Sequence, residues 1–264
     1  MLRYKIPIII MLSKQPQKEK RLSLRGAVQI GRRSFFVFKQ GCKMFLKSGK
    51  DEKLHKSVVQ SMIDANPHIA RILHRYHIKP LIDTKTLKEL TGGHMNDTCN
   101  IAMGVYSILS DEIKCHVDKE SLKEASMLHD LGKVLIPSKI LNKPAKLNNK
   151  ERRIMNIHST LGYELLKTQD LPEETLALIR YHHQNLIHSG YPVLPKDKTS
   201  ADLGVQIISI ADKYSALREA RVYRKPLSRI DSLLILYREV REGKILPEVF
   251  NALLKYAEMY DKAA

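Results

Sequence analysis

The segment that decides how this chain is interpreted is His129-Asp-Leu-Gly-Lys-Val-Leu-Ile-Pro137. It follows residues 122–128, whose apolar side chains recur at helical spacing, so we predict that His129 and Asp130 stand at the end of a helix. Adjacent residues on a helix diverge by about 100°. The two side chains therefore cannot chelate one ion in parallel, and the Asp130 carboxylate can instead bridge toward a second ion. The segment predicts a two-metal site at a helix end.

Further potential ligands are spread along the chain. A lone histidine is more often a surface or core residue than a ligand, so each is weighed by its context. His182-His183 closes one predicted helix, His94 opens another, and His158 lies in an amphipathic helix. Asp212 follows an apolar run, where an ionised carboxylate costs several kcal/mol unless it is paired or metal-bound. Imidazole and carboxylate groups without thiolates favour iron, manganese, nickel or zinc.

The hydrophobic pattern predicts an all-α protein from about residue 54 onward. Asn148 and Pro172 suit helix starts, and Gly132, Gly190 and Gly243 suit helix stops. Between residues 21 and 47 short β-prone pieces suggest a small hairpin. The predicted helices are 54–65, 68–77, 84–92, 95–112, 120–131, 148–168, 173–187, 203–220, 228–242 and 247–260.

Positive charge is concentrated at the N-terminus. Residues 1–50 carry 13 Lys/Arg against the single acid Glu19, which is +12 of the total charge of +17. Such an arm can hold nucleic acid or an anionic membrane surface weakly through its charge. The alternative is a partly disordered, solubilising extension, and the sequence does not choose between the two.

Cysteine usage and hydropathy favour a soluble, cytoplasmic protein. Three cysteines without a Cys-x-x-Cys pair argue against both a disulfide framework and a thiolate zinc site. No apolar run approaches the roughly 20 residues that a membrane-spanning helix needs. The apolar stretch 6–12 lacks a following small-residue cleavage site and is interpreted as retained.

More motifs follow the first one in a fixed order. They are Ile140-Leu-Asn-Lys-Pro-Ala-Lys-Leu147, Ile154-Met-Asn-Ile-His158, Tyr181-His-His183, Ser189-Gly-Tyr-Pro192, Ile210-Ala-Asp212, Tyr223-Arg-Lys-Pro-Leu-Ser228 and Gly243-Lys-Ile-Leu-Pro247. With the opening segment they resemble the HD superfamily of metal phosphohydrolases and, within it, the HD-GYP phosphodiesterases of cyclic di-GMP. The resemblance runs from about Thr84 to the C-terminus.

The resemblance implies a fold and a division of the chain. The fold would be an HD-domain helical bundle with extra C-terminal HD-GYP helices, preceded by a short basic N-terminal region. We expect a basic extension over residues 1–50, a helical connector over 51–80 and the HD-GYP-like phosphohydrolase domain over 81–264. The connector helices would pack on the catalytic domain or form a homodimer contact.

The resemblance also implies a site and a reaction. Two divalent ions, iron or manganese with zinc and nickel left open, would activate a water that hydrolyses cyclic di-GMP to pGpG, with onward cleavage to GMP left open. One ion would be held by His94, His129, Asp130 and Asp212, and the other by Asp130, His158, His182 and His183. Lys133 would act with Asp130 in catalysis by contacting the scissile phosphate. Substrate contacts would come from Lys133, Gly190, Tyr191, Pro192, Arg221, Arg224 and Lys225.

The sequence departs from the family at three places. Gln184 replaces the glutamate of the usual His-His-Glu, and Ile187-His188 replaces an Asp-Gly pair. Leu90 stands where some members carry a glutamate that supports a third metal, so two metals are predicted. Two alternatives remain: a phosphohydrolase of another nucleotide or cyclic dinucleotide, and a degenerate regulatory domain that binds without turnover.

Overall fold

The computed structural model describes residues 60, 63, 64, 66–79, 93–194, 202–220 and 225–260. Within these ranges the regular structure is helical, apart from one isolated bridge between His183 and Tyr191. The elements are α3 (Pro67–Arg75), α5 (His94–Ile108), α6 (Asp111–Lys114), α7 (Lys119–Leu128), the 3₁₀ helix η1 (Leu131–Leu135), α8 (Ser138–Leu141), α9 (Asn149–Asn156), α10 (His158–Leu166), α11 (Glu173–Tyr181), α12 (Leu203–Arg218), α13 (Arg229–Arg241) and α14 (Pro247–Tyr260).

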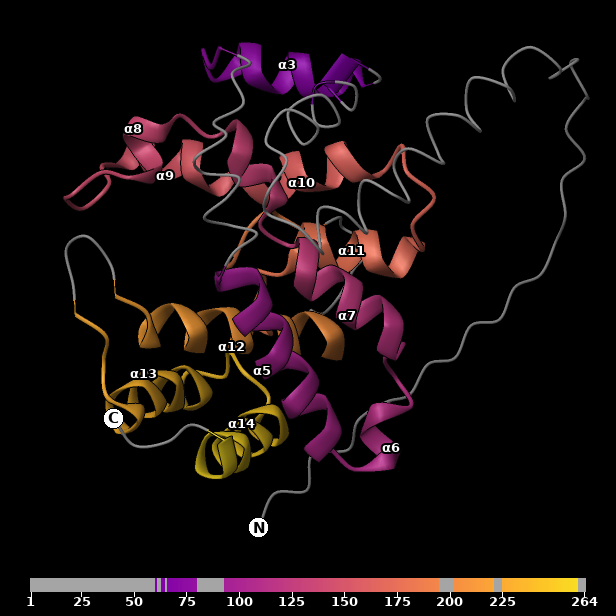
Figure 1. The fold of residues 1–264 in the computed structure, drawn as a ribbon, viewed down its shortest axis with the longest axis vertical. Helices are drawn as coiled ribbons and strands as arrows, with labels where there is room; N and C mark the ends of the chain where they lie inside the picture. Colours follow the sequence, from indigo (N-terminus) through magenta and orange to yellow (C-terminus); the bar gives the residue numbers. More distant parts are fainter. Residues whose placement is uncertain are drawn as a thin grey trace, which may run out of the picture.

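The helices α5, α7 and α12 pack against one another and form the centre of the bundle. Helix α5 also packs against α14. On the other side of α7, helix α10 packs against both η1 and α11 (Figure 1). The helices α13 and α14 lie together against α12, at the end of the molecule opposite α3. The expected all-α fold with additional C-terminal helices is therefore confirmed.

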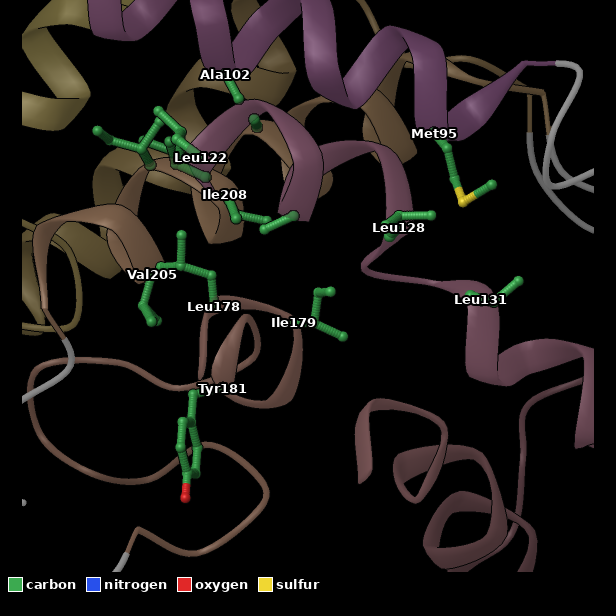
Figure 2. Close-up of a cluster of buried hydrophobic side chains, with 14 of the residues drawn as sticks. Met95, Ala102, Leu122, Leu128, Leu131, Leu178, Ile179, Tyr181, Val205 and Ile208 are labelled. Atoms are coloured by element: carbon green, nitrogen blue, oxygen red, sulfur yellow. The ribbon is translucent and has the colours of Figure 1, made fainter. Parts of the chain in front are cut away.

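The core between these helices is made of aliphatic side chains from elements far apart in the sequence. Figure 2 shows Ala102 of α5, Leu122 of α7, Leu178 of α11 and Ile208 of α12 turned into one cluster. None of the four is more than 1% exposed. Burying side chains of this kind contributes roughly 1.5–3 kcal/mol each for the larger ones. This core fixes the helix ends that carry the polar residues described below.

Several predicted helix boundaries are confirmed. Asn148 caps α9 in a reciprocal capping box with Glu151, and Pro172 precedes α11. Gly243 follows α13 with φ +71°, a conformation that suits a glycine at a helix stop. These positions were identifiable because the capping chemistry is local.

Other boundaries were wrong. The predicted helix 148–168 is two helices, α9 and α10, which meet at Ile157. The helix predicted to reach residue 187 ends at Tyr181, so Gly190 does not stop it. The prediction 95–112 joined α5 to the separate α6, and η1 and α8 were missed. Short elements of four or five residues have too few positions for a periodicity to show.

The basic extension 1–50, the hairpin over 21–47 and the helix 84–92 lie outside the described residues. The division at residues 50 and 80 therefore stays a prediction. Among the described helices, none combines the length and the apolar character needed to cross a lipid bilayer.

Gly132 allows η1 to lie directly on α10. A Cβ atom at this position would be 1.9 Å from the carbonyl oxygen of His158 and 2.5 Å from the amide nitrogen of Gly162. Both neighbours are backbone atoms, which cannot rotate away. The contact holds the segment after Asp130 against the first turn of α10.

We predict that Gly132→Ala lowers the free energy of unfolding by about 1–3 kcal/mol, because the added methyl group forces η1 away from α10. Urea unfolding followed by circular dichroism measures the change. Gly93→Ala is the matched control, since a Cβ there meets nothing within 4 Å. Equal stability of the two variants would contradict the prediction.

Candidate metal centre

The fold brings together seven polar side chains that the sequence singled out. His94 begins α5, His129 and Asp130 follow α7, His158 begins α10, His182 and His183 follow α11, and Asp212 lies in α12. His129, Asp130 and His182 are fully buried, and Asp212 is 7% exposed. His158 lies in a helix as predicted, but as the first residue of α10, because the single predicted helix is broken at Ile157.

Three of the histidines are oriented by the same local contact. The Nδ1 of His129 lies 2.9 Å from the carbonyl oxygen of Ser126, and the Nδ1 of His182 lies 2.7 Å from that of Ile179. The Nδ1 of His158 lies 2.8 Å from the carbonyl oxygen of Met155. Each ring donates to a carbonyl of the last helical turn, where carbonyls lack the i+4 amide partners of the helix interior. This contact directs the Nε2 atom of each ring to the centre.

Asp130 faces two different groups of residues with its two oxygens. Its Oδ2 lies 3.5 Å from His129 Nε2 and 3.7 Å from His94 Nε2. Its Oδ1 lies 3.3 Å from His158 Nε2. Asp212 joins the first group, with Oδ1 2.9 Å from His94 Nε2.

Two sets of potential ligands result, and they share Asp130. One is His94, His129, Asp130 and Asp212, and the other is Asp130, His158, His182 and His183. Within each set the candidate ligand atoms lie within 4.8 Å of one another. The structure thus groups the residues as the family resemblance implied.

Several atoms in the centre lack an ordinary hydrogen-bond partner. His129 Nε2 and Asp130 Oδ1 are buried without one in the part of the chain that the structure describes. His158 Nε2 lies 3.3 Å from His182 Nε2 and 3.2 Å from His183 Nε2. Since His158 and His182 use their Nδ1 protons on carbonyls, their facing Nε2 atoms have no proton to share. Such an arrangement fits divalent cations, which accept imidazole and carboxylate ligands together.

The histidines of the centre fall into two classes, one with a raised and one with a lowered pKa. Burial lowers the pKa of His94, but hydrogen bonds to Asp212 and Glu219 outweigh it and raise the pKa to about 9. Burial likewise opposes protonation of His129, yet Asp130 and Asp212 raise its pKa to about 10. Burial dominates at His158 and lowers its pKa to about 4.

The remaining members of the centre follow the same balance of burial and charge. Burial lowers the pKa of His182 to about 3 and that of His183 well below its usual value. Burial raises the pKa of the Asp130 carboxyl, but Lys133 and His129 outweigh it and hold it well below its usual range. Asp130 is therefore a carboxylate at neutral pH.

Glu219 belongs to the centre but was missed by the sequence analysis. Its Oε1 lies 2.9 Å from His94 Nδ1, so it orients His94 as the carbonyls orient the other rings. Carboxylates that hold the outer nitrogen of a ligating histidine fix its tautomer and raise its basicity. Glu219 directly follows α12, the helix that carries Asp212. No motif in the sequence pointed to it.

The Gly190–Pro192 turn lies over the second set of ligands. The Tyr191 ring centroid is 4.5 Å from that of His183 and 6.1 Å from that of His158. Burial raises the pKa of Tyr191 far above its usual value, with the Asp212 and Asp130 carboxylates adding to the effect. The hydroxyl therefore remains a hydrogen-bond donor.

The other residues expected to contact substrate differ in how far the structure tests them. The Lys133 ammonium donates to Asp130 Oδ2 and so lies beside the centre. Lys225 is exposed, and Arg221 and Arg224 lie outside the described residues. Their roles stay predictions.

The comparison with protein families decides the affiliation. Residues 94–249 match the model described as "HD domain", which is more than half of the chain and includes all seven residues of the centre. The chain belongs to the HD-domain family. The curated relatives described next are named as cyclic dinucleotide phosphodiesterases, which agrees with the HD-GYP resemblance that the motifs indicated.

This HD domain resembles several named phosphodiesterases. It is 32% identical over 153 residues to the 3'3'-cGAMP-specific phosphodiesterase 1 of Vibrio cholerae, covering 58% of this chain and 35% of that protein. It is 35% identical over 137 residues to the cyclic di-GMP phosphodiesterase response regulator RpfG of Xanthomonas campestris, covering 51% and 35%. The chain thus spans about a third of the length of these relatives.

Among solved structures, the HD domain resembles Bd1817, an HDG"Y"P protein from Bdellovibrio bacteriovorus. The TM-score is 0.51 at 11% identity, covering 87% of this chain and 70% of that one. At this identity the likeness concerns the fold alone.

His188 occupies a strained position in the loop before the Gly190–Pro192 turn. Its φ of +57° is the left-handed conformation, which an L-residue adopts at a cost of roughly 1–2 kcal/mol. The family's glycine at this position would avoid that cost.

We predict that His188→Gly raises the free energy of unfolding by up to about 1 kcal/mol. Thermal unfolding measures it, with His116→Gly as the control at an exposed residue whose φ is not positive.

An unchanged or lower melting temperature for His188→Gly, relative to the His116→Gly control, would show that the loop is not strained at this residue.

We predict that divalent cations release protons when they bind this centre. The raised pKa values of His94 and His129 keep both rings protonated at pH 7.5, and a cation must displace those protons from Nε2. Affinity for Mn²⁺ should therefore rise with pH until about pH 9–10, where the rings lose their protons by themselves. Titration calorimetry in buffers of different ionisation enthalpy measures the release. An observed enthalpy independent of the buffer would refute it.

Proposed function

We propose that this HD domain is a metal-dependent phosphodiesterase that hydrolyses a cyclic dinucleotide, with cyclic di-GMP as the first substrate and linear pGpG as its product. The observation that carries the proposal is the division of Asp130 between two ligand sets, one oxygen toward His129 and the other toward His158. A carboxylate bridging two cations is the arrangement used for in-line attack on phosphate esters.

Two divalent cations in these sets, with iron or manganese favoured, would supply an acidified water and offset charge on the phosphate oxygens. The first would be held by His94, His129, Asp130 and Asp212. The second would be held by Asp130, His158, His182 and His183. The donor set supports this because neither set contains a thiolate, and the buried His129 Nε2 and Asp130 Oδ1 otherwise lack partners.

The chain's own residues would do the remaining work. The Lys133 ammonium, now donating to Asp130 Oδ2, lies where it can turn to the scissile phosphate and stabilise charge that develops there. Tyr191 keeps its proton and can donate to the substrate, and its ring offers a face for a base. Glu219 holds His94 and prevents it from rotating away.

The substrate class is supported by the relatives. Their names include cyclic di-GMP and 3'3'-cGAMP phosphodiesterases, so both cyclic dinucleotides are candidates. Because the chain covers about a third of these proteins, the choice between them rests on measurement. A degenerate domain that binds without turnover is the second candidate, favoured only by Gln184 in place of a glutamate.

We predict that protein purified anaerobically contains two divalent ions and cleaves cyclic di-GMP or 3'3'-cGAMP when supplied with manganese or iron. Asp130→Ala should lose at least one ion and reduce turnover by about 100-fold or more, because both sets lose their shared ligand. Chromatography of the products and elemental analysis measure the two effects.

Asp111→Ala is the matched control, since that carboxylate is 98% exposed and pairs with Lys114 at the surface. Two bound ions without cleavage of either nucleotide would favour another phosphate ester. Absence of bound metal would favour the regulatory alternative, and three ions per chain would contradict the two-metal assignment.

A further inference from the structure

Gln184, the residue that departs from the family's His-His-Glu, is buried beneath the substrate-side turn. Its side chain is 1% exposed, and Nε2 donates a hydrogen bond to the carbonyl oxygen of Pro192. Its Oε1 is buried without a hydrogen-bond partner in the part of the chain that the structure describes. The contact therefore uses the amide's donor, which a carboxylate lacks.

The backbone brings the turn close to Gln184 by two further contacts. The amide of Tyr191 donates to the carbonyl of His183 at 3.4 Å, as part of the isolated antiparallel bridge. A Cβ on Gly190 would lie 2.1 Å from the His183 carbonyl oxygen and 2.7 Å from the Gln184 Cα. The entry to the turn is thus fixed by the bridge and by close packing of Gly190.

The exit from the turn is held differently. Pro192 has no amide hydrogen, so among its backbone polar atoms only its carbonyl can hydrogen-bond, and Gln184 is the residue that binds it. Val193, the next residue, is 89% exposed. Without the Gln184 amide, Pro192 would lose its side-chain contact to the base of the turn.

Tyr191 lies between these two attachments. Its ring packs on His183 with centroids 4.5 Å apart, beside the ligand set that includes His158. A glutamate carboxylate at position 184 would place an acceptor against the Pro192 carbonyl, and two buried acceptors repel each other. The path of this turn therefore suits a hydrogen-bond donor at position 184, which the glutamine amide supplies.

We propose that Gln184 is a positioning residue that holds the Gly190–Pro192 turn, and with it the Tyr191 ring, over the second ligand set. The donor amide is the group that does this, so the departure from glutamate is not a sign of lost activity. The effect on substrate rests on the proposed function, whereas the effect on the turn does not.

The test compares Gln184→Ala and Gln184→Glu with the unsubstituted 264-residue chain. Gln206→Ala is the matched control, because Gln206 is also a 1% exposed glutamine but lies in α12. Hydrogen–deuterium exchange of residues 189–194 reports the turn, elemental analysis reports the metals, and steady-state kinetics separates KM from kcat.

Loss of one hydrogen bond should speed exchange of the Tyr191 amide by about 3- to 10-fold in Gln184→Ala. KM for the cyclic dinucleotide should rise by a similar, roughly 3- to 10-fold factor, with kcat and metal content close to the wild type. Gln184→Glu should change exchange and KM at least as much, and Gln206→Ala should change neither.

Unchanged exchange of residues 189–194 in both Gln184 variants would overturn the proposal, as would an unchanged KM. Loss of metal in Gln184→Ala would overturn it as well, because Gln184 would then support the ligands rather than the turn. If the wild type cleaves no cyclic dinucleotide, the proposed function fails, and the exchange result still decides whether Gln184 holds the turn.

Discussion

The structure of this HD domain depends on one buried carboxylate. Asp130 is fully buried at the junction of α7 and η1, where an isolated negative charge would be strongly unfavourable. The Lys133 ammonium and the surrounding imidazoles compensate it. Because its two oxygens face different histidines, the same group that must be neutralised also divides the centre into two sets. Neutralisation of the buried charge and the proposed metal binding therefore both require Asp130 to lie between the two groups of residues.

The ends of helices, rather than their faces, supply most of the centre. His129, His158 and His182 each donate to a carbonyl in the last turn of the preceding helix. This contact satisfies a helix end and sets the ring orientation in one step, since a ring held at Nδ1 turns its Nε2 toward the centre. Rigid packing of α10 on η1 through Gly132 then holds two of these helix ends at a fixed separation. The positions of these rings are fixed because the helices that carry them are packed into the core.

The loop between His183 and Pro192 carries both departures from the family that the structure describes. His188 accepts a left-handed backbone, and Gln184 gives its amide to the Pro192 carbonyl. The first change adds strain, and the second adds a contact that a carboxylate could not make. The loop thus differs from the family pattern at Gln184 and His188, whereas the seven residues of the centre lie in the two groups that the resemblance implied.

The sequence by itself determined the helical class, most long helices and the seven polar residues of the centre, because periodicity, capping and ordered motifs are local properties. It also indicated that the Asp130 carboxylate can bridge toward a second ion, since neighbouring helical residues diverge. It did not reveal the break at Ile157, the end of α11 at Tyr181, or Glu219, which is 125 residues from the His94 ring that it orients. These features depend on which carbonyls and ring nitrogens face each other after packing. Only the tertiary structure decides that, because a hydrogen bond between distant segments leaves no periodic trace in the sequence.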